Sequence, residues 1–230
     1  MRTMCGRYAT TRSEADLSDL FEAVDLTEGL GPSWNVAPTD PVPIVRVSQR
    51  HDARVLDTAR WGLVPPWAPD TRGAARMINA RSETVATSPA FAPSFARRRC
   101  LVPADGWFEW IRDGKQKQAF YMTPADGSGL AFAGIWSPWG PESLLTCSVL
   151  TTAAVGGLAR VHDRMPLVLP PERWAAWLAG DGDGDPAELV RPMTESELAV
   201  IEVRPVGAAV GNVRNNGPHL LDPPVEAKLF

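Results

Sequence analysis

The chain has 230 residues, of which 44% are hydrophobic and 22% charged, so it is long enough to bury a core in one large domain or two small ones. Its formal net charge of −4 argues mildly against a nucleic acid partner. No run of about 18 apolar residues is present, which excludes a transmembrane helix, and the N-terminus lacks the apolar core of a secretory signal, so we expect a cytoplasmic protein with no membrane partner.

The first predicted element is a helix that begins after Ser13. Serine is a favoured N-cap residue, and acidic residues follow it in the first turn, where the helix dipole favours negative charge. Apolar residues then recur on one helical face, at Leu17, Leu20, Phe21 and Val24. The glycines at residues 29–31 predict where this helix ends.

Most of the remaining pattern is typical of strands. Runs rich in β-branched and aromatic residues predict strands at residues 44–47, 55–64, 100–112, 119–122, 130–136, 144–152 and 166–169. Two further helices are predicted at residues 172–179 and 195–201. Strands and helices do not alternate regularly, and neither a repeat nor a linker is evident. The sequence therefore predicts an α+β fold: a single domain over residues 1–230, with mostly antiparallel sheets curled into a barrel-like core and flanking helices.

The cysteines and histidines are dispersed along the chain. Neither C-x-x-C nor H-E-x-x-H spacing occurs among Cys5, Cys100, Cys147, His51, His162 and His219. We therefore expect free thiols, no metal site and no cofactor.

Charge is unevenly distributed, which weakens the argument from net charge. Residues 46–99 carry ten arginines against four acidic residues, while the segments before and after them are acidic. A guanidinium group suits phosphate and stacked bases, although an arginine-rich composition also arises from GC-rich coding. Charge alone leaves phosphate binding at this segment open.

Six short motifs combine polar and aromatic residues in a way that scaffold segments rarely do. They are MCGRY (4–8), WNVAPT (34–39), RWGLVPPW (60–67), INARSET (78–84), RRCLVPADGWFEW (98–110) and HDRMP (162–166). Glu109 lies between two aromatic residues, so its carboxylate must be hydrogen-bonded or functional. Each polar residue also has a structural interpretation on its own: Glu109 paired with an arginine, His162 at a strand end, Asn79 in a turn.

Taken together and in this order, the motifs resemble the SRAP (SOS response-associated peptidase) family, over about residues 5–217. The resemblance implies a protein that captures abasic sites in single-stranded DNA through a covalent crosslink and so shields the lesion. It implies a crosslinking enzyme of lyase type, with autoproteolysis before the cysteine as an older proposal for the family. A single abasic site per pocket gives no reason for more than a monomer.

The resemblance assigns roles to particular residues. Its catalytic set corresponds here to Cys5, Asn79, Glu109 and His162. Its DNA-binding positions correspond to Arg7, Asn35, Pro38, Trp67, Arg81 and Arg164. Trp107-Phe108 replaces a more usual Phe-Tyr pair and leaves Glu109 in register.

The implied chemistry explains why a cysteine at the N-terminus is needed. An open abasic sugar carries an aldehyde, and a 1,2-aminothiol captures an aldehyde as an imine that the thiol closes into a thiazolidine. The pKa of an α-amino group, about 7.7–8.0, leaves a usable neutral fraction at cytoplasmic pH. His162 is expected to exchange a proton with the sugar oxygen, Glu109 to deprotonate the amine, and Asn79 to orient the reactants.

Two other functions remain open from the residues alone. An N-terminal-nucleophile amidohydrolase would share the exposed Cys5 and the pair Glu109 and His162. A non-catalytic single-strand-binding module would need only the basic and aromatic residues. Crosslinking also requires a free amine on Cys5, so we expect translation to begin at Met4, or self-cleavage before Cys5.

Overall fold

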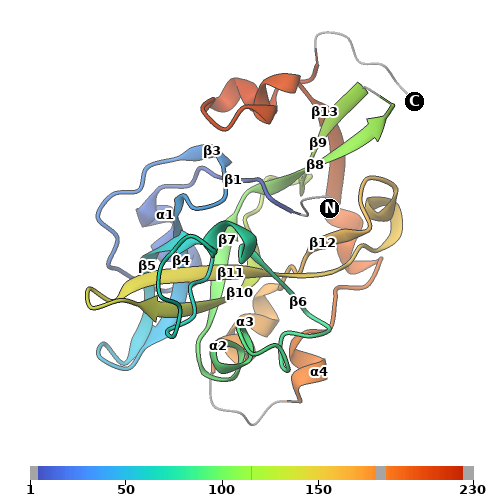
Figure 1. The fold of residues 1–230 in the computed structure, drawn as a ribbon. Coiled ribbons are helices and arrows are strands. Elements are labelled where there is room, and N and C mark those ends of the chain that lie inside the picture. The colour runs from blue at the N-terminus through green and yellow to red at the C-terminus, as the bar shows by residue number, and fades with distance from the viewer. Residues whose placement is uncertain (1–4, 115, 180–184, 225–230) are drawn as a thin grey trace.

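A closed barrel forms the centre of the molecule (Figure 1). In the described part of the chain its strands are β4 (Pro41–Ser48), β5 (Ala53–Trp61), β7 (Arg99–Ala104), β10 (Leu130–Trp139) and β11 (Leu144–Ala153). Neighbouring strands pair antiparallel in the order β11-β10-β7-β4-β5, and a parallel pairing between β11 and β5 closes the ring. The predicted barrel-like α+β fold is therefore confirmed, with one parallel junction in an otherwise antiparallel barrel.

The computed structural model describes residues 5–114, 116–179 and 185–224. The question of whether the chain starts at Met4 lies outside these residues.

Alternation of side chains along the barrel strands separates two apolar clusters. On β7, Cys100, Val102 and Ala104 face the barrel interior, whereas Leu101 faces outward. The outer cluster includes buried residues of α1 (Glu14–Phe21), α2 (Ala92–Arg97) and α3 (Pro171–Leu178). Because strand side chains alternate with period two, helices cover the outside while the interior fills with its own side chains.

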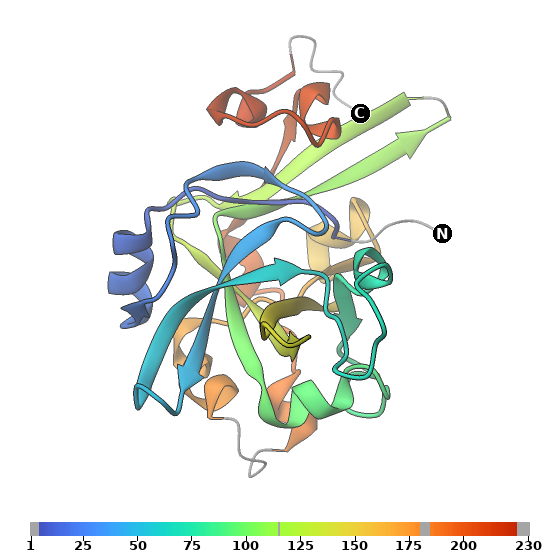
Figure 2. The same ribbon diagram turned by 60° about the vertical axis from the view of Figure 1, so that its left-hand side comes forward.

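A second sheet crosses one side of the barrel and extends beyond it (Figure 2). Its strand order is β13 (Ile201–Val206), β9 (Gln116–Pro124), β8 (Gly106–Asp113), β1 (Tyr8–Thr10) and β3 (Ser33–Val36). One face of this sheet packs on the barrel, and the other face is covered by two short 3-10 helices near the C-terminus. The β8–β9 ribbon therefore connects the barrel core to the C-terminal segment.

Short elements complete the fold and carry several of the sequence motifs. Strand β6 (Asn79–Arg81) pairs parallel with β11, and β12 (Arg164–Pro166) pairs antiparallel with the same strand. The two-residue strand β2 (Val24–Asp25) pairs parallel with β5, and the short helix α4 (Pro186–Leu189) follows α3 along the chain. Strand β11 thus brings the INARSET and HDRMP motifs together.

Three predicted elements differ from the structure. The first helix ends at Phe21 and not near residues 29–31, because Glu22 adopts a left-handed conformation (φ 51°) and Val24 enters a strand. The predicted strand 100–112 turns at Asp105, whose carboxylate accepts hydrogen bonds from the main chain and hydroxyl of Thr11. Its two halves consequently belong to different sheets.

The third difference lies near the C-terminus. The predicted helix at residues 195–201 is a 3-10 turn that leads into β13, which pairs with β9 from Ile201 onward. β-branched residues alternate with charged ones over residues 201–204 of β13, and this pattern suits an exposed edge strand better than a helix. The structure thus adds an edge strand to the second sheet.

The start of β8 tests how tightly this architecture is packed. A Cβ atom at Gly106 would lie 2.3 Å from the carbonyl oxygen of Met122, so we expect Gly106→Ala to destabilise the protein by about 1–3 kcal/mol. At Gly157 nothing lies within 4 Å of such an atom, so Gly157→Ala should change stability by less than about 0.5 kcal/mol. Urea unfolding of both variants measures the difference, and equal stabilities would contradict the close approach.

Candidate active site

Cys5, three residues before the start of β1, contacts the buried carboxylate of Glu109 on β8. The main-chain N–H of Cys5 donates to Oε1 of Glu109 at 2.8 Å. Cys5 and Glu109 are only 4% and 2% exposed, so this contact is shielded from water. It follows from the register of β1 on β8, in which Tyr8 pairs with Trp107. The backbone therefore brings the nitrogen of Cys5 to the Glu109 carboxylate, near the end of the RRCLVPADGWFEW motif.

Asn79 and Arg164 add two contacts to Cys5. The side-chain amide of Asn79 donates to the carbonyl of Cys5 at 3.4 Å, and the thiol of Cys5 lies 3.9 Å from the carbonyl oxygen of Arg164. Asn79 begins β6 and Arg164 begins β12, the two strands that flank β11. Three motifs distant in sequence therefore converge on Cys5.

Cys5 also has an unusual backbone conformation. Its φ of 36° lies in the left-handed region, which non-glycine residues seldom adopt. Such conformations cost of order 1–3 kcal/mol and are concentrated at functional sites.

The imidazole of His162 has two partners on one nitrogen. Nδ1 accepts a hydrogen bond from the main-chain N–H of Arg164 at 3.0 Å, and it also lies 2.9 Å from a carboxylate oxygen of Asp163. The first contact needs a lone pair on Nδ1 and the second needs a proton, so one protonation state cannot satisfy both. Nε2 is buried and has no hydrogen-bond partner among the described residues.

Burial changes the acidity of both groups at the Cys5–Glu109 contact. Desolvation raises the pKa of the Cys5 thiol well above its usual range, and the adjacent Glu109 carboxylate raises it further. Desolvation also raises the pKa of Glu109, while its hydrogen bond from Cys5 and the nearby His162 oppose that rise. The sulfur therefore keeps its proton at neutral pH, and Glu109 titrates closer to neutrality than an exposed glutamate.

The predicted DNA-binding residues do not form one cluster. The Arg7 guanidinium donates to the side chain of Asn35 at 2.8 Å and to the carbonyl of Val210 at 2.7 Å. The amide of Asn35 in turn donates to the carbonyls of Asn212 and Asn215. Arg7 and Asn35 thus hold the C-terminal segment against β1 and β3, a structural role that the sequence did not predict.

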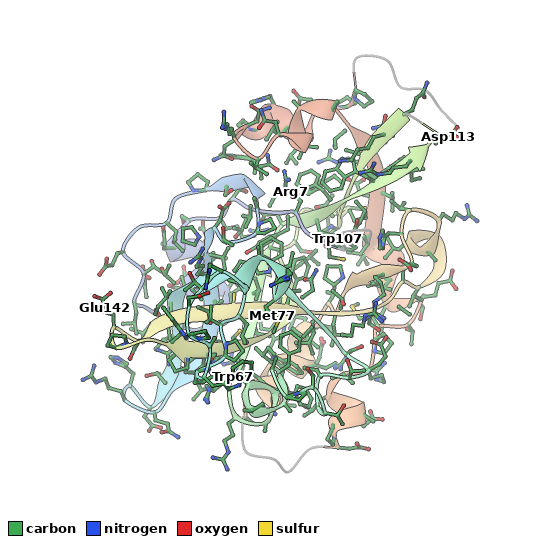
Figure 3. The ribbon with its side chains drawn as sticks, viewed as in Figure 1. Arg7, Trp67, Met77, Trp107, Asp113 and Glu142 are labelled. Atoms are coloured by element: carbon green, nitrogen blue, oxygen red, sulfur yellow. The ribbon has the colours of Figure 1, made fainter. Side chains whose placement is uncertain are left out.

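Pro38 and Trp67 lie in loops at the edge of the barrel. Pro38 is half-buried, whereas Trp67 is 70% exposed and borders an apolar cavity of about 390 Å³. Figure 3 shows Trp67 well separated from Arg7 across the molecule. An exposed indole beside an apolar hollow is available for stacking on a flat ring.

The remaining predicted DNA residues, Arg81 and Arg164, lie on either side of β11. Arg81 is exposed, whereas the Arg164 guanidinium is 12% exposed and is bound by Glu83 and by the main chain and hydroxyl of Thr151. Sequence reasoning missed Glu83, Thr151 and Asp163 as partners of this site. Glu83 lies inside the INARSET motif and Asp163 inside the HDRMP motif. Their place in these motifs was the sequence signal that could have identified them as partners of the site.

In the described part of the chain, no cluster of three or more His, Cys, Asp or Glu side chains is placed to hold a metal ion. None of its helices is long and apolar enough to cross a membrane.

Comparison with known proteins identifies relatives over nearly the full chain. The family described as SOS response associated peptidase (SRAP) matches residues 4–213. The chain is 36% identical over 230 residues to the abasic site processing protein YedK of Escherichia coli, covering 96% of this chain and 100% of that one. It is 30% identical over 266 residues to the abasic site processing protein HMCES of Xenopus tropicalis, covering 95% and 78%.

Solved structures show the same fold. A protein from Bacteroides thetaiotaomicron superposes with a TM-score of 0.81 at 22% identity, covering 95% of this chain and 99% of that one. A phage-related protein from Bordetella bronchiseptica gives a TM-score of 0.66 at 29% identity, covering 90% and 98%. The barrel and the second sheet are therefore an arrangement shared with other proteins.

The raised pKa of Glu109 gives a pH-dependent stability prediction. A folded-state pKa above the unfolded value means that ionised Glu109 costs stability, a cost that is absent below the unfolded pKa of about 4.3 and grows as pH rises through the folded pKa. Glu109→Gln should therefore raise Tm at about pH 7, by about 2–4 °C for each kcal/mol relieved, and leave Tm nearly unchanged at about pH 4.

Thermal unfolding of the parent and the variant at the two pH values measures this effect. Glu202→Gln removes an exposed carboxylate on β13 and is the matched control, with no gain expected at either pH. A lower Tm for Glu109→Gln at neutral pH would contradict the conclusion that the ionised, buried Glu109 carboxylate costs stability.

Proposed function

The chain belongs to the SOS response associated peptidase (SRAP) family, and from that premise we propose that it captures abasic sites in single-stranded DNA as a covalent thiazolidine on Cys5. The family relationship supports a role in processing abasic sites, because relatives over the full chain length carry that name. One observation carries the finer proposal: the nitrogen of Cys5 donates to the buried carboxylate of Glu109 at 2.8 Å.

The reaction joins the aldehyde of the open sugar to the α-amine and thiol of a chain that begins at Cys5. The amine attacks the aldehyde carbon, Glu109 accepts a proton from nitrogen, and the carbinolamine loses water to give an imine. The thiol then adds to the imine carbon while its proton passes to nitrogen, which closes the five-membered ring. The balance is aldehyde plus aminothiol to thiazolidine plus one water, with no oxidant or cofactor.

The order of these steps agrees with the acidities in the site. Burial keeps the Cys5 sulfur protonated, so the amine is the better first nucleophile, and the thiol reacts only after the imine has formed. The same protonated sulfur disfavours the amidohydrolase alternative, in which a thiolate would have to attack an amide directly. A chain that begins at Cys5 also has no φ angle at that residue, and therefore does not bear the cost of the left-handed conformation.

His162 and Asn79 have supporting roles in this proposal. A protonated His162 can donate from Nε2 to the sugar ring oxygen while Asp163 accepts from Nδ1. The C1–O bond to the ring oxygen breaks, the C1 hydroxyl gives its proton to water, and the open aldehyde results. The Asn79 amide holds the carbonyl of Cys5 and thereby orients the amine. Arg81 and Arg164 are proposed to bind flanking phosphates, and Trp67 to stack on a base.

A covalent adduct is the first testable outcome. The protein beginning at Cys5 should form a band that survives denaturing electrophoresis with an abasic single strand, and it should form none with an intact strand. Cys5→Ala should lower the rate of adduct formation by at least about 100-fold, because neither ring closure nor the trapped product is then possible.

Cys147→Ala is the matched control, because Cys147 is also a buried free cysteine but lies inside the barrel. It should retain the adduct. If Cys5→Ala formed as much adduct as the parent, the proposed reaction at Cys5 would be wrong. Hydrolysis of amide substrates that depends on Cys5 would favour the amidohydrolase alternative.

The roles of Glu109 and His162 are separable by pH. The parent's rate should rise with pH as Glu109 loses its proton, through a pKa above the usual glutamate range. Glu109→Gln should lose this dependence and react about 10²–10⁴-fold more slowly. His162→Ala should keep the Glu109-dependent rise but react more slowly with the closed sugar.

Single-turnover rates across pH, with DNA affinity measured separately by anisotropy, test these assignments. A substrate that already carries the open aldehyde should restore the reaction rate of His162→Ala more than that of Glu109→Gln. Identical pH profiles for the parent and both variants would contradict the assigned proton transfers.

A further inference from the structure

Glu83 occupies the position where the proposed function expects a phosphate. Its two carboxylate oxygens face the Arg164 guanidinium as a fork, Oε1 at 2.5 Å from Nη1 and Oε2 at 3.0 Å from Nη2. Arg81, two residues before Glu83, also interacts favourably with its negative charge. The Glu83 carboxylate is therefore bound by Arg164, and the positive charge of Arg81 lies close enough to favour its ionised form.

The two partners in this ion pair are anchored very differently. The Arg164 guanidinium is fixed from behind by the carbonyl of Thr151 at 2.5 Å and by its hydroxyl at 3.2 Å, and is 12% exposed. The Glu83 side chain is 50% exposed and follows β6 in a turn. Glu83 is thus the more exposed partner, which a ligand can reach and displace, while the main chain and hydroxyl of Thr151 hold Arg164.

Carboxylate and phosphate present the same pair of oxygens to an arginine fork. Because Glu83 contacts both Nη atoms of Arg164, a phosphate that is to bind the same two nitrogens must replace Glu83. Hydrogen bonds from Arg164 hold the pKa of Glu83 below its usual range, so Glu83 remains negatively charged through neutral and mildly acidic pH.

We propose that the Glu83 carboxylate mimics a DNA phosphate. In the free protein Glu83 occupies the phosphate subsite of Arg81 and Arg164, and a backbone phosphate of a bound single strand displaces it. This inference rests on the proposed function, because it takes single-stranded DNA as the ligand. It identifies Glu83 as a residue that lowers the affinity of the protein for single-stranded DNA. Each strand must break the Glu83–Arg164 ion pair before its phosphate can bind the Arg164 guanidinium.

The consequence is selectivity for strands that remain bound. An intact strand repeatedly exchanges with Glu83 and leaves, whereas a strand captured covalently at an abasic site keeps its phosphate at Arg164. Glu83 thereby reduces the time that the protein spends on undamaged DNA. Since Arg164 also contacts Cys5 and His162 through its main chain, the exchange takes place beside the reacting groups.

The test measures the affinity of the protein for an intact oligothymidine strand by fluorescence anisotropy at several salt concentrations. Glu83→Gln removes the competing charge, so it should bind about threefold to tenfold more tightly at low salt, a gain of at most about 1.4 kcal/mol. Its salt slope should steepen by about 0.7, the value for one more phosphate contact on a single strand.

Matched variants separate this effect from a change in net charge. Glu202→Gln makes the same chemical change at a glutamate that lies 3.7 Å from Arg204 on β13, and its affinity should stay at the parent value. Glu83→Asp keeps the competing charge and should bind more weakly than Glu83→Gln. Glu83→Ala provides the same comparison as Glu83→Gln if the glutamine variant does not fold.

Binding at or below the parent affinity for both Glu83→Gln and Glu83→Ala would overturn the inference, because Glu83 would then support Arg164 and not compete with DNA. The readout uses a strand without a lesion, so it does not depend on covalent chemistry. A parent protein that binds the strand but never crosslinks an abasic site would overturn the proposed reaction and leave the Glu83 comparison standing. A parent that binds no single strand would overturn both.

Discussion

The buried carboxylate of Glu109 is the constraint around which the site is built. A carboxylate that is 2% exposed must be hydrogen-bonded, and here the main-chain N–H of Cys5 provides that bond. The bond requires β1 to run along β8 in one register, which in turn requires the chain to turn at Asp105 and leave the barrel. Local chemistry and the junction of the two sheets are thus coupled through one side chain.

Strand β11 provides the second half of this arrangement. It pairs with β6 on one side and with β12 on the other, so Asn79 and Arg164 approach Cys5 from opposite directions. The same strand offers the carbonyl of Thr151, to which both the Ser82 main chain and the Arg164 side chain donate. The ion pair between Arg164 and Glu83 then connects β12 to the turn after β6. The barrel therefore positions rigid strands, and not loops alone, around Cys5.

Much of this site was predictable from sequence, because its residues lie in short motifs with unusual polar content. The convergence of Cys5, Asn79 and Glu109 agrees with the family resemblance. The partners Glu83 and Asp163 were not predicted, although they adjoin predicted residues, because an ion pair depends on strand order and not on spacing along the chain. The structural engagement of Arg7 and Asn35 with residues near the C-terminus is equally a long-range contact. Runs of β-branched and aromatic residues predicted the barrel strands. Strand β13 was not predicted, because its pairing with β9 decides its conformation, and the helix expected at residues 195–201 is a 3-10 turn that leads into it.

The central claim is that Cys5 itself, as the first residue, bonds to the sugar carbon. Mass spectrometry of the protein after reaction with an abasic single strand, followed by digestion and sequencing of the crosslinked peptide, tests it most directly. The expected mass is that of the chain from Cys5 plus the strand minus one water, with the DNA remnant on the N-terminal peptide. An adduct on a lysine or another cysteine, or an adduct formed by a chain that still carries Met4 before Cys5, would contradict it.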